Sequence, residues 1–141
     1  MANGYALALR QQKLNDITAA IGNAGILTMY DGTQPTTGGA VTTQTTLAVF
    51  TLGSPFAPAA TGILGGTVSI SPNLPSPALV PSFTGTKNAT WYRITTSGGT
   101  FVADGTISVT GGGGDIQLVT ISLVSGMYVS IPVWVISGGN P

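Results

Sequence analysis

The stretch ATWYRITTSGGTFVADGTISV, residues 89–109, sets the fold class of this 141-residue chain. It contains two runs rich in β-branched and aromatic residues, 89–96 and 100–109, joined by the loop Thr96-Ser97-Gly98-Gly99. Two such runs around a short loop with glycine are typical of a β-hairpin. The stretch therefore predicts two adjacent antiparallel strands.

Further runs of the same kind lie on both sides of this hairpin. We expect strands at 26–30, 45–52, 67–71, 116–123 and 127–137, with Gly, Pro, Asn or Asp between them. Seven or eight strands at this spacing predict an all-β fold, a jelly-roll-like antiparallel β-sandwich. Segments 34–41, 52–66 and 72–81 are not expected to belong to the core. The glycine run in 110–114 predicts a loop that is either mobile or closely approached by neighbouring atoms.

The last predicted strand, 127–137, alternates most clearly. Its wholly apolar set is expected to face the core: Met127, Val129, Ile131, Val133 and Val135. Tyr128 and Trp134 belong to the opposite set and are expected to point outward. Pro132 has no N–H for a sheet, so the strand should lie at an edge or bulge there, and its outward face is a candidate contact surface.

The N-terminal part predicts one amphipathic helix. Residues 5–21 are mostly good helix formers, with Asn3 as a plausible N-cap and Gly22 as a terminator. One stripe carries Leu14, Ile17 and Ile21, with Leu7 and Arg10. We expect a single domain over 1–141, with a helical arm at 1–24 and the β-sandwich at 25–141, and we favour docking of the helix on another subunit.

Composition excludes more functions than any motif supports. Charged residues make up 6% of the chain and the net charge is zero, whereas globular domains average about 25% charged residues. His, Cys and Glu are absent, which removes the usual catalytic triads and the His- or thiolate-based metal sites. No basic patch indicates nucleic-acid binding, and no apolar run reaches the ~20 residues of a membrane helix. We expect no cofactor, no metal, no membrane or nucleic-acid partner, and synthesis in the cytoplasm without a secretory signal.

Three motifs could carry chemistry. Asp31-Gly32-Thr33 recurs as Asp104-Gly105-Thr106, and two carboxylates can serve acid–base catalysis, but Asp-Gly is what tight turns select. Asp115 alone cannot form a calcium cage. The aromatic residues Trp91, Tyr92 and Trp134 could stack on a sugar, although packing in the core is the simpler interpretation.

The segments LNDITAAI (14–21), LTMYDGTQP (27–35), LAVF (47–50) and ATWYRI (89–94) resemble small virion proteins of tailed bacteriophages, most closely capsid cement (decoration) proteins. The resemblance implies a jelly roll or related β-fold on the virion, at the capsid surface, with the major capsid protein as partner and no catalytic residues. A homo-oligomer is expected, a dimer slightly ahead of a trimer.

The rival hypothesis is a receptor- or glycan-binding module of a phage tail or fibre. Under the cement hypothesis, the candidate contacts are the helix stripe, the proline segment and the outward face of the last strand: Leu14, Ile17, Ile21, Pro72, Pro75, Pro77, Pro81, Tyr128 and Trp134.

Overall fold

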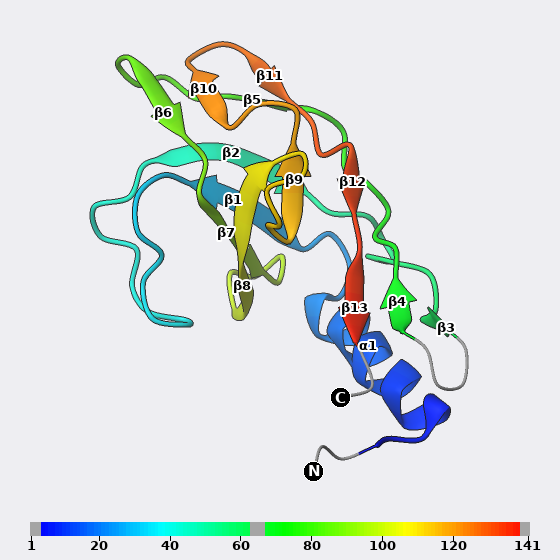
Figure 1. The fold of residues 1–141 in the computed structure, drawn as a ribbon. Coiled ribbons are helices and arrows are strands. Elements are labelled where there is room, and N and C mark those ends of the chain that lie inside the picture. The colour runs from blue at the N-terminus through cyan, green and yellow to red at the C-terminus, as the bar shows by residue number, and fades with distance from the viewer. Residues whose placement is uncertain (1–3, 63–66, 139–141) are drawn as a thin grey trace.

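The computed structural model describes residues 4–62 and 67–138. The chain is mostly β with a single N-terminal helix, and its largest sheet is curled (Figure 1). This confirms the all-β class. In place of seven or eight strands, the described residues form thirteen. The predicted strands 116–123 and 127–137 are divided into five short ones, and three more, at 61–62, 78–79 and 86–88, lie where no strand was predicted. No helix in the described ranges is long and apolar enough to cross a membrane.

The helix α1 (Leu7–Ile21) begins two residues later than predicted and ends where predicted. Gly22 has φ +69°, and its N–H donates to the Thr18 carbonyl at 3.1 Å. This left-handed conformation suits glycine, which has no Cβ to clash. Asn3, the predicted N-cap, lies outside the described residues.

The curled sheet has the strand order β12-β9-β8-β7-β1-β2. Its members are β1 (Ile26–Tyr30), β2 (Thr46–Thr51), β7 (Trp91–Thr95), β8 (Phe101–Val109), β9 (Ile116–Leu118) and β12 (Val133–Trp134). The predicted hairpin is confirmed, since β7 and β8 pair antiparallel and the Thr96 N–H donates to the Thr100 carbonyl at 2.8 Å.

One pair in this sheet, β8 with β9, is parallel. Parallel neighbours usually need a crossover of a dozen or more residues, whereas here only 110–115 intervene. The short connection suffices because Ile116 lies beside Ile107, so β9 starts next to the end of β8. A Cβ on Gly114 would lie 2.7 Å from the Ser108 backbone nitrogen, which confirms the tightly approached glycine loop.

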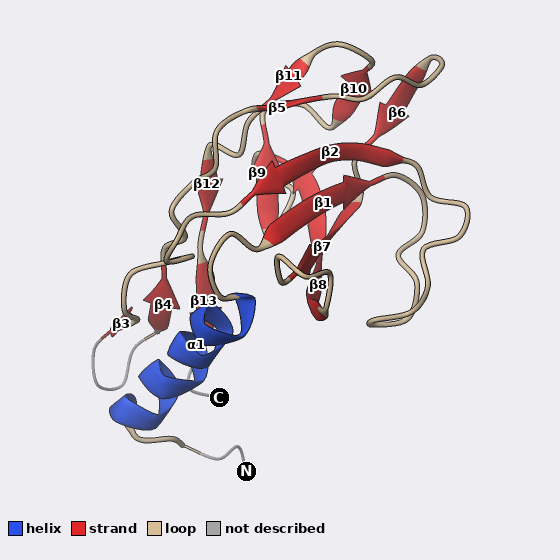
Figure 2. Ribbon diagram, turned by 180° about the vertical axis from the view of Figure 1, so that it is seen from behind, coloured by secondary structure: helices blue, strands red, loops and turns tan. Residues whose placement is uncertain are grey.

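The other strands form small sheets around this one. β3 (Thr61–Gly62), β4 (Val68–Ile70) and β13 (Ile136–Gly138) form a three-stranded sheet beside α1. Two ribbons pair β5 (Ala78–Leu79) with β11 (Tyr128–Val129) and β6 (Thr86–Asn88) with β10 (Ser122–Val124). Both ribbons lie at the end of the molecule away from α1, as the two opposite views show (Figures 1 and 2).

The predicted last strand is wrong as a single element. It is split into β11, β12 and β13, which pair with three different strands. Val129 and Ile131 are buried as expected, but after Pro132 the phase reverses: Trp134 is 3% exposed and Val133 is 64% exposed. Pro132 cannot donate to a ladder, so the chain breaks there and the following residues turn over.

The set of buried residues corrects two other expectations. The segment 52–66 was expected to lie outside it, yet Leu52, Phe56, Ala57 and Ala60 are buried. Leu14 and Ile21 of α1 belong to the same core cluster, with Ile17 packed against it. The helix therefore packs on its own domain, because its apolar stripe covers the sheet formed by β13, β4 and β3 and the open end of the curled sheet.

Candidate functional site

Ion pairs within the protein neutralise half of its few charges. The Arg93 guanidinium binds Asp104 through two contacts, Nε to Oδ1 at 2.7 Å and Nη2 to Oδ2 at 2.8 Å. The Asp104 side chain is only 1% exposed. Lys87 pairs with Asp31 at 3.1 Å. The two ion pairs contain four of the chain's eight charged side chains. Because each pair is neutral, these four side chains contribute little net field at the surface.

The two Asp-Gly-Thr motifs have different structures. Asp31 follows directly after the end of β1, and Gly32 follows at φ +70°, which fits the expected turn. Asp104-Gly105 lies inside β8, so the expected second turn is wrong. Gly105 faces Tyr92 across the sheet, and a Cβ there would lie 2.4 Å from the Tyr92 ring. Glycine is needed at this position because the ring occupies the side-chain space.

The Asp31 carboxylate links three segments. Its oxygens accept hydrogen bonds from the Thr45 backbone N–H and from Lys87 Nζ. Burial alone would raise the pKa of Asp31, but these bonds and the Lys87 charge bring it below its usual value of 3.8. A carboxylate with a depressed pKa stabilises the folded state above its unfolded pKa.

This depressed pKa predicts a loss of stability in acid. As the pH falls from about 4 through the lower folded pKa of Asp31, the free energy of unfolding should decrease. Asp31→Asn should be less stable than wild type by about 1 kcal/mol at pH 7 and should show a smaller decrease below pH 4. Urea unfolding at pH 7, 4 and 3 measures both effects. Equal pH dependence in the two proteins would show that Asp31 does not cause the acid step.

The aromatic residues of the glycan hypothesis are buried. Trp91 is 1% exposed, stacks on Tyr30 at 4.5 Å between ring centroids and donates from Nε1 to the Asp31 carbonyl at 3.1 Å. Tyr92 contacts Trp134 edge to face at 5.8 Å. None of the three predicted stacking residues presents an open ring face, and Trp134 is no candidate for surface contact in this structure.

The proline segment is only partly on the surface. Pro72 is buried and Pro75 is half-buried, whereas Pro77 and Pro81 are exposed on either side of β5. Pairing of β5 with β11 places Leu79 directly opposite Tyr128. The fold thus brings together the exposed part of the proline segment and Tyr128, which was correctly predicted to point outward.

Around this pair lies a group of exposed apolar side chains, which we call the apolar tip: Leu79, Val119, Val124 and Tyr128. Their exposed fractions are 55%, 84%, 43% and 69%. Val119 and Tyr128 line the same shallow depression. Large apolar side chains that gather on one end of a protein are typical of an interaction surface.

Sequence reasoning missed three members of this surface. Leu79 lies in the proline segment 72–81, for which no strand was predicted, and Val119 and Val124 lie in or next to the predicted continuous strand 116–123. The chain bends between β9 and β10, which exposes Val119. The sequence around Val119 does not show whether the chain bends there, which exposes the side chain, or continues as a buried strand.

Comparisons with protein-family models, with curated proteins and with solved structures gave no match to this chain.

Proposed function

We propose that this chain is a structural virion protein that binds the outside of a phage capsid and stabilises the shell by bridging neighbouring major capsid protein subunits. The observation that carries the proposal is the apolar tip on a molecule with almost no surface charge. A surface of this kind costs little to desolvate and gains free energy when a partner covers it. The resemblance of four sequence segments to phage cement proteins supplies the identity of the partner.

In this proposal the apolar tip, with Pro77 and Pro81 at its border, contacts the shell. The curled sheet and its small ribbons form the body, in the role that a jelly-roll-like sandwich has in cement proteins. Copies of the chain associate, as a two-fold dimer ahead of a trimer, so that weak contacts repeat over the lattice. Repetition raises the total affinity because each further contact is made at high effective concentration.

The proposal is tested on heads of a phage that carries this gene, compared with heads from a deletion mutant. Electron cryomicroscopy should show density of this size on the outer shell of the first heads and none on the second. Unchanged shells together with altered tails would overturn the proposal in favour of the tail or fibre module. The stacking residues of that alternative, Trp91, Tyr92 and Trp134, are buried.

The tip itself is tested with the double variant Leu79→Asp, Tyr128→Asp. Both side chains are exposed, so the fold should be retained, while two carboxylates in the contact should weaken binding to deletion-mutant heads by about tenfold or more. Cosedimentation with the heads measures the loss. Val133→Asp is the matched control, because Val133 is equally exposed but lies on β12. If both variants lost binding to the heads equally, the apolar tip would not be the contact surface.

A further inference from the structure

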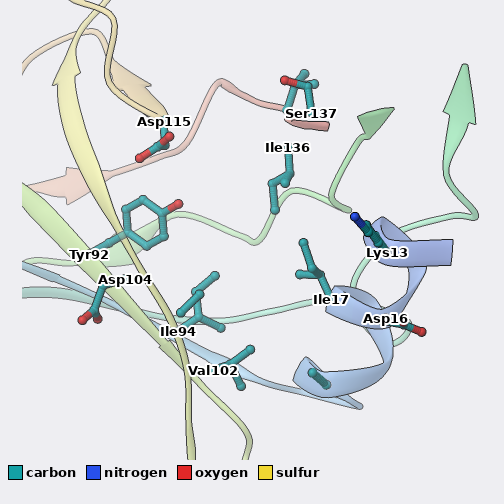
Figure 3. Close-up of a pocket in the computed structure, with 13 residues that line it drawn as sticks. Lys13, Asp16, Ile17, Tyr92, Ile94, Val102, Asp104, Asp115, Ile136 and Ser137 are labelled. Atoms are coloured by element: carbon teal, nitrogen blue, oxygen red, sulfur yellow. The ribbon is translucent and has the colours of Figure 1, made fainter. Parts of the chain in front are cut away.

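A pocket lies between α1 and the inner face of the curled sheet, at the other end of the molecule from the apolar tip. Its volume is about 490 Å³, within the usual range for small-molecule sites. Apolar walls come from Ile17 on α1 and from Ile94 and Val102 on β7 and β8. The Tyr92 hydroxyl points into this space, with Asp115 on the same side (Figure 3).

The charges around the pocket do not cancel. The helix contributes one cation and one anion, Lys13 and Asp16, and Asp16 is held by a hydrogen bond from Gln12 at 2.7 Å. Asp104 points away from the pocket in Figure 3 and is neutralised by Arg93. Neither Asp16 nor Asp115 forms an ion pair among the described residues, and Asp115 lies on the same side of the pocket as the Tyr92 hydroxyl.

The hydrogen bonds to the Asp115 carboxylate come from uncharged groups. Its Oδ2 accepts from the Thr106 N–H at 2.8 Å and from the Thr106 hydroxyl at 2.9 Å, which are neutral donors. In the part of the chain that the structure describes, Asp115 forms no ion pair. The pKa of the Tyr92 phenol is raised, first by burial and then by the negative charge of Asp115. The end of the pocket beside Tyr92 is therefore both apolar and negative.

We propose that this pocket binds a primary alkylammonium group. The ammonium would donate to Asp115 and the Tyr92 hydroxyl, and the methylenes would lie against Ile17, Ile94 and Val102. An alkylammonium combines one positive charge with a slender apolar chain, which matches the Asp115 carboxylate beside Tyr92 and the apolar walls. The group could be a lysine side chain of another protein or a free small amine. The proposal does not depend on capsid binding.

The test uses n-butylammonium as the probe and n-butanol as its neutral counterpart, titrated into the isotopically labelled protein by NMR. Butylammonium should shift the amide signals of Ile94 and Val102 and bind about fivefold more tightly than butanol. Asp115→Asn should reduce its affinity to that of butanol. Asp16→Asn is the matched control, because it removes a carboxylate from the helix side of the pocket, away from the Tyr92 hydroxyl, and should lower the affinity less than Asp115→Asn does.

A second variant tests the walls. Ala20 is exposed and lines the pocket, so Ala20→Leu should fill the space without disturbing the core and should abolish binding of both probes. Equal affinity for butylammonium and butanol, an unchanged affinity in Asp115→Asn, or an equal loss in Asp16→Asn would each overturn the proposal.

The two sources of the ammonium are separated by two further probes, N-acetyl-lysine methylamide and butane-1,4-diamine. Tighter binding of the blocked lysine would assign the pocket to a protein partner, and tighter binding of the diamine would assign it to a free amine. If neither binds, the proposal is wrong.

Discussion

Replacement of Trp134 by alanine is expected to lower the free energy of unfolding by about 3–5 kcal/mol. Trp134 is 3% exposed and packs edge to face against Phe56 at 5.3 Å and Tyr92 at 5.8 Å between ring centroids. Alanine would remove this burial and leave a cavity that the surrounding strands can close only in part. Urea unfolding followed by circular dichroism measures the change.

Tyr128→Ala is the matched control for this experiment. The alternation of the sequence places Tyr128 and Trp134 on one outward face, but the structure leaves Tyr128 69% exposed. Its replacement should change the stability by no more than about 0.5 kcal/mol. Similar small effects of the two substitutions would indicate that Trp134 points outward, as an uninterrupted strand predicts. They would contradict the reversal at Pro132.

The second large effect is expected at Asp104. Asp104→Ala should destabilise the protein by about 3–5 kcal/mol, because it leaves the Arg93 guanidinium without its carboxylate in a mostly buried place. The loop between β1 and β2 should loosen as well. Asp104 Oδ2 accepts from the Gly38 N–H at 3.1 Å, and Arg93 Nη1 donates to the Gly39 carbonyl at 2.8 Å.

Two measurements separate these effects. Urea unfolding reports the loss of stability, and hydrogen exchange at the Gly38 amide reports the release of the loop. Asp16→Ala is the control, since Asp16 is exposed and its carboxylate accepts a hydrogen bond from Gln12 on the same helix. This substitution should cost less than about 0.5 kcal/mol. Slow exchange at Gly38 in Asp104→Ala would show that the loop is held by other contacts.

Local sequence patterns predicted the helix and the longer strands of the sheet. Residues 26–30 were predicted as a strand and form β1, and the hairpin around Gly98 and Gly99 forms as expected. These elements depend on neighbouring residues, namely β-branched runs, helix formers and glycine in turns, so a short window contains their signals.

The candidate site could be predicted only in pieces. Tyr128 was correctly identified as an exposed residue, but Leu79 was not, because the two meet only when β5 pairs with β11. The charged pair was missed for another reason: Arg93 lies opposite Asp104 within the predicted hairpin, but the Asp-Gly pair was interpreted as a turn. The contact of Leu79 with Tyr128, in contrast, joins segments far apart in the sequence. A pairing between distant segments has no counterpart in the local pattern.

The sequence by itself determined the all-β class, the single helix with its buried stripe, the position of the hairpin and the scarcity of charge. Only the tertiary structure decided which side of the last segment faces the core, that α1 packs on its own domain, and that Leu79, Val119, Val124 and Tyr128 lie at one end of the molecule. The physical reason is that helices and turns form through contacts between near neighbours, whereas burial depends on which distant segments pack together. At Pro132 the missing N–H breaks the ladder, and packing of the Trp134 ring against Phe56 and Tyr92 then sets the direction of the chain.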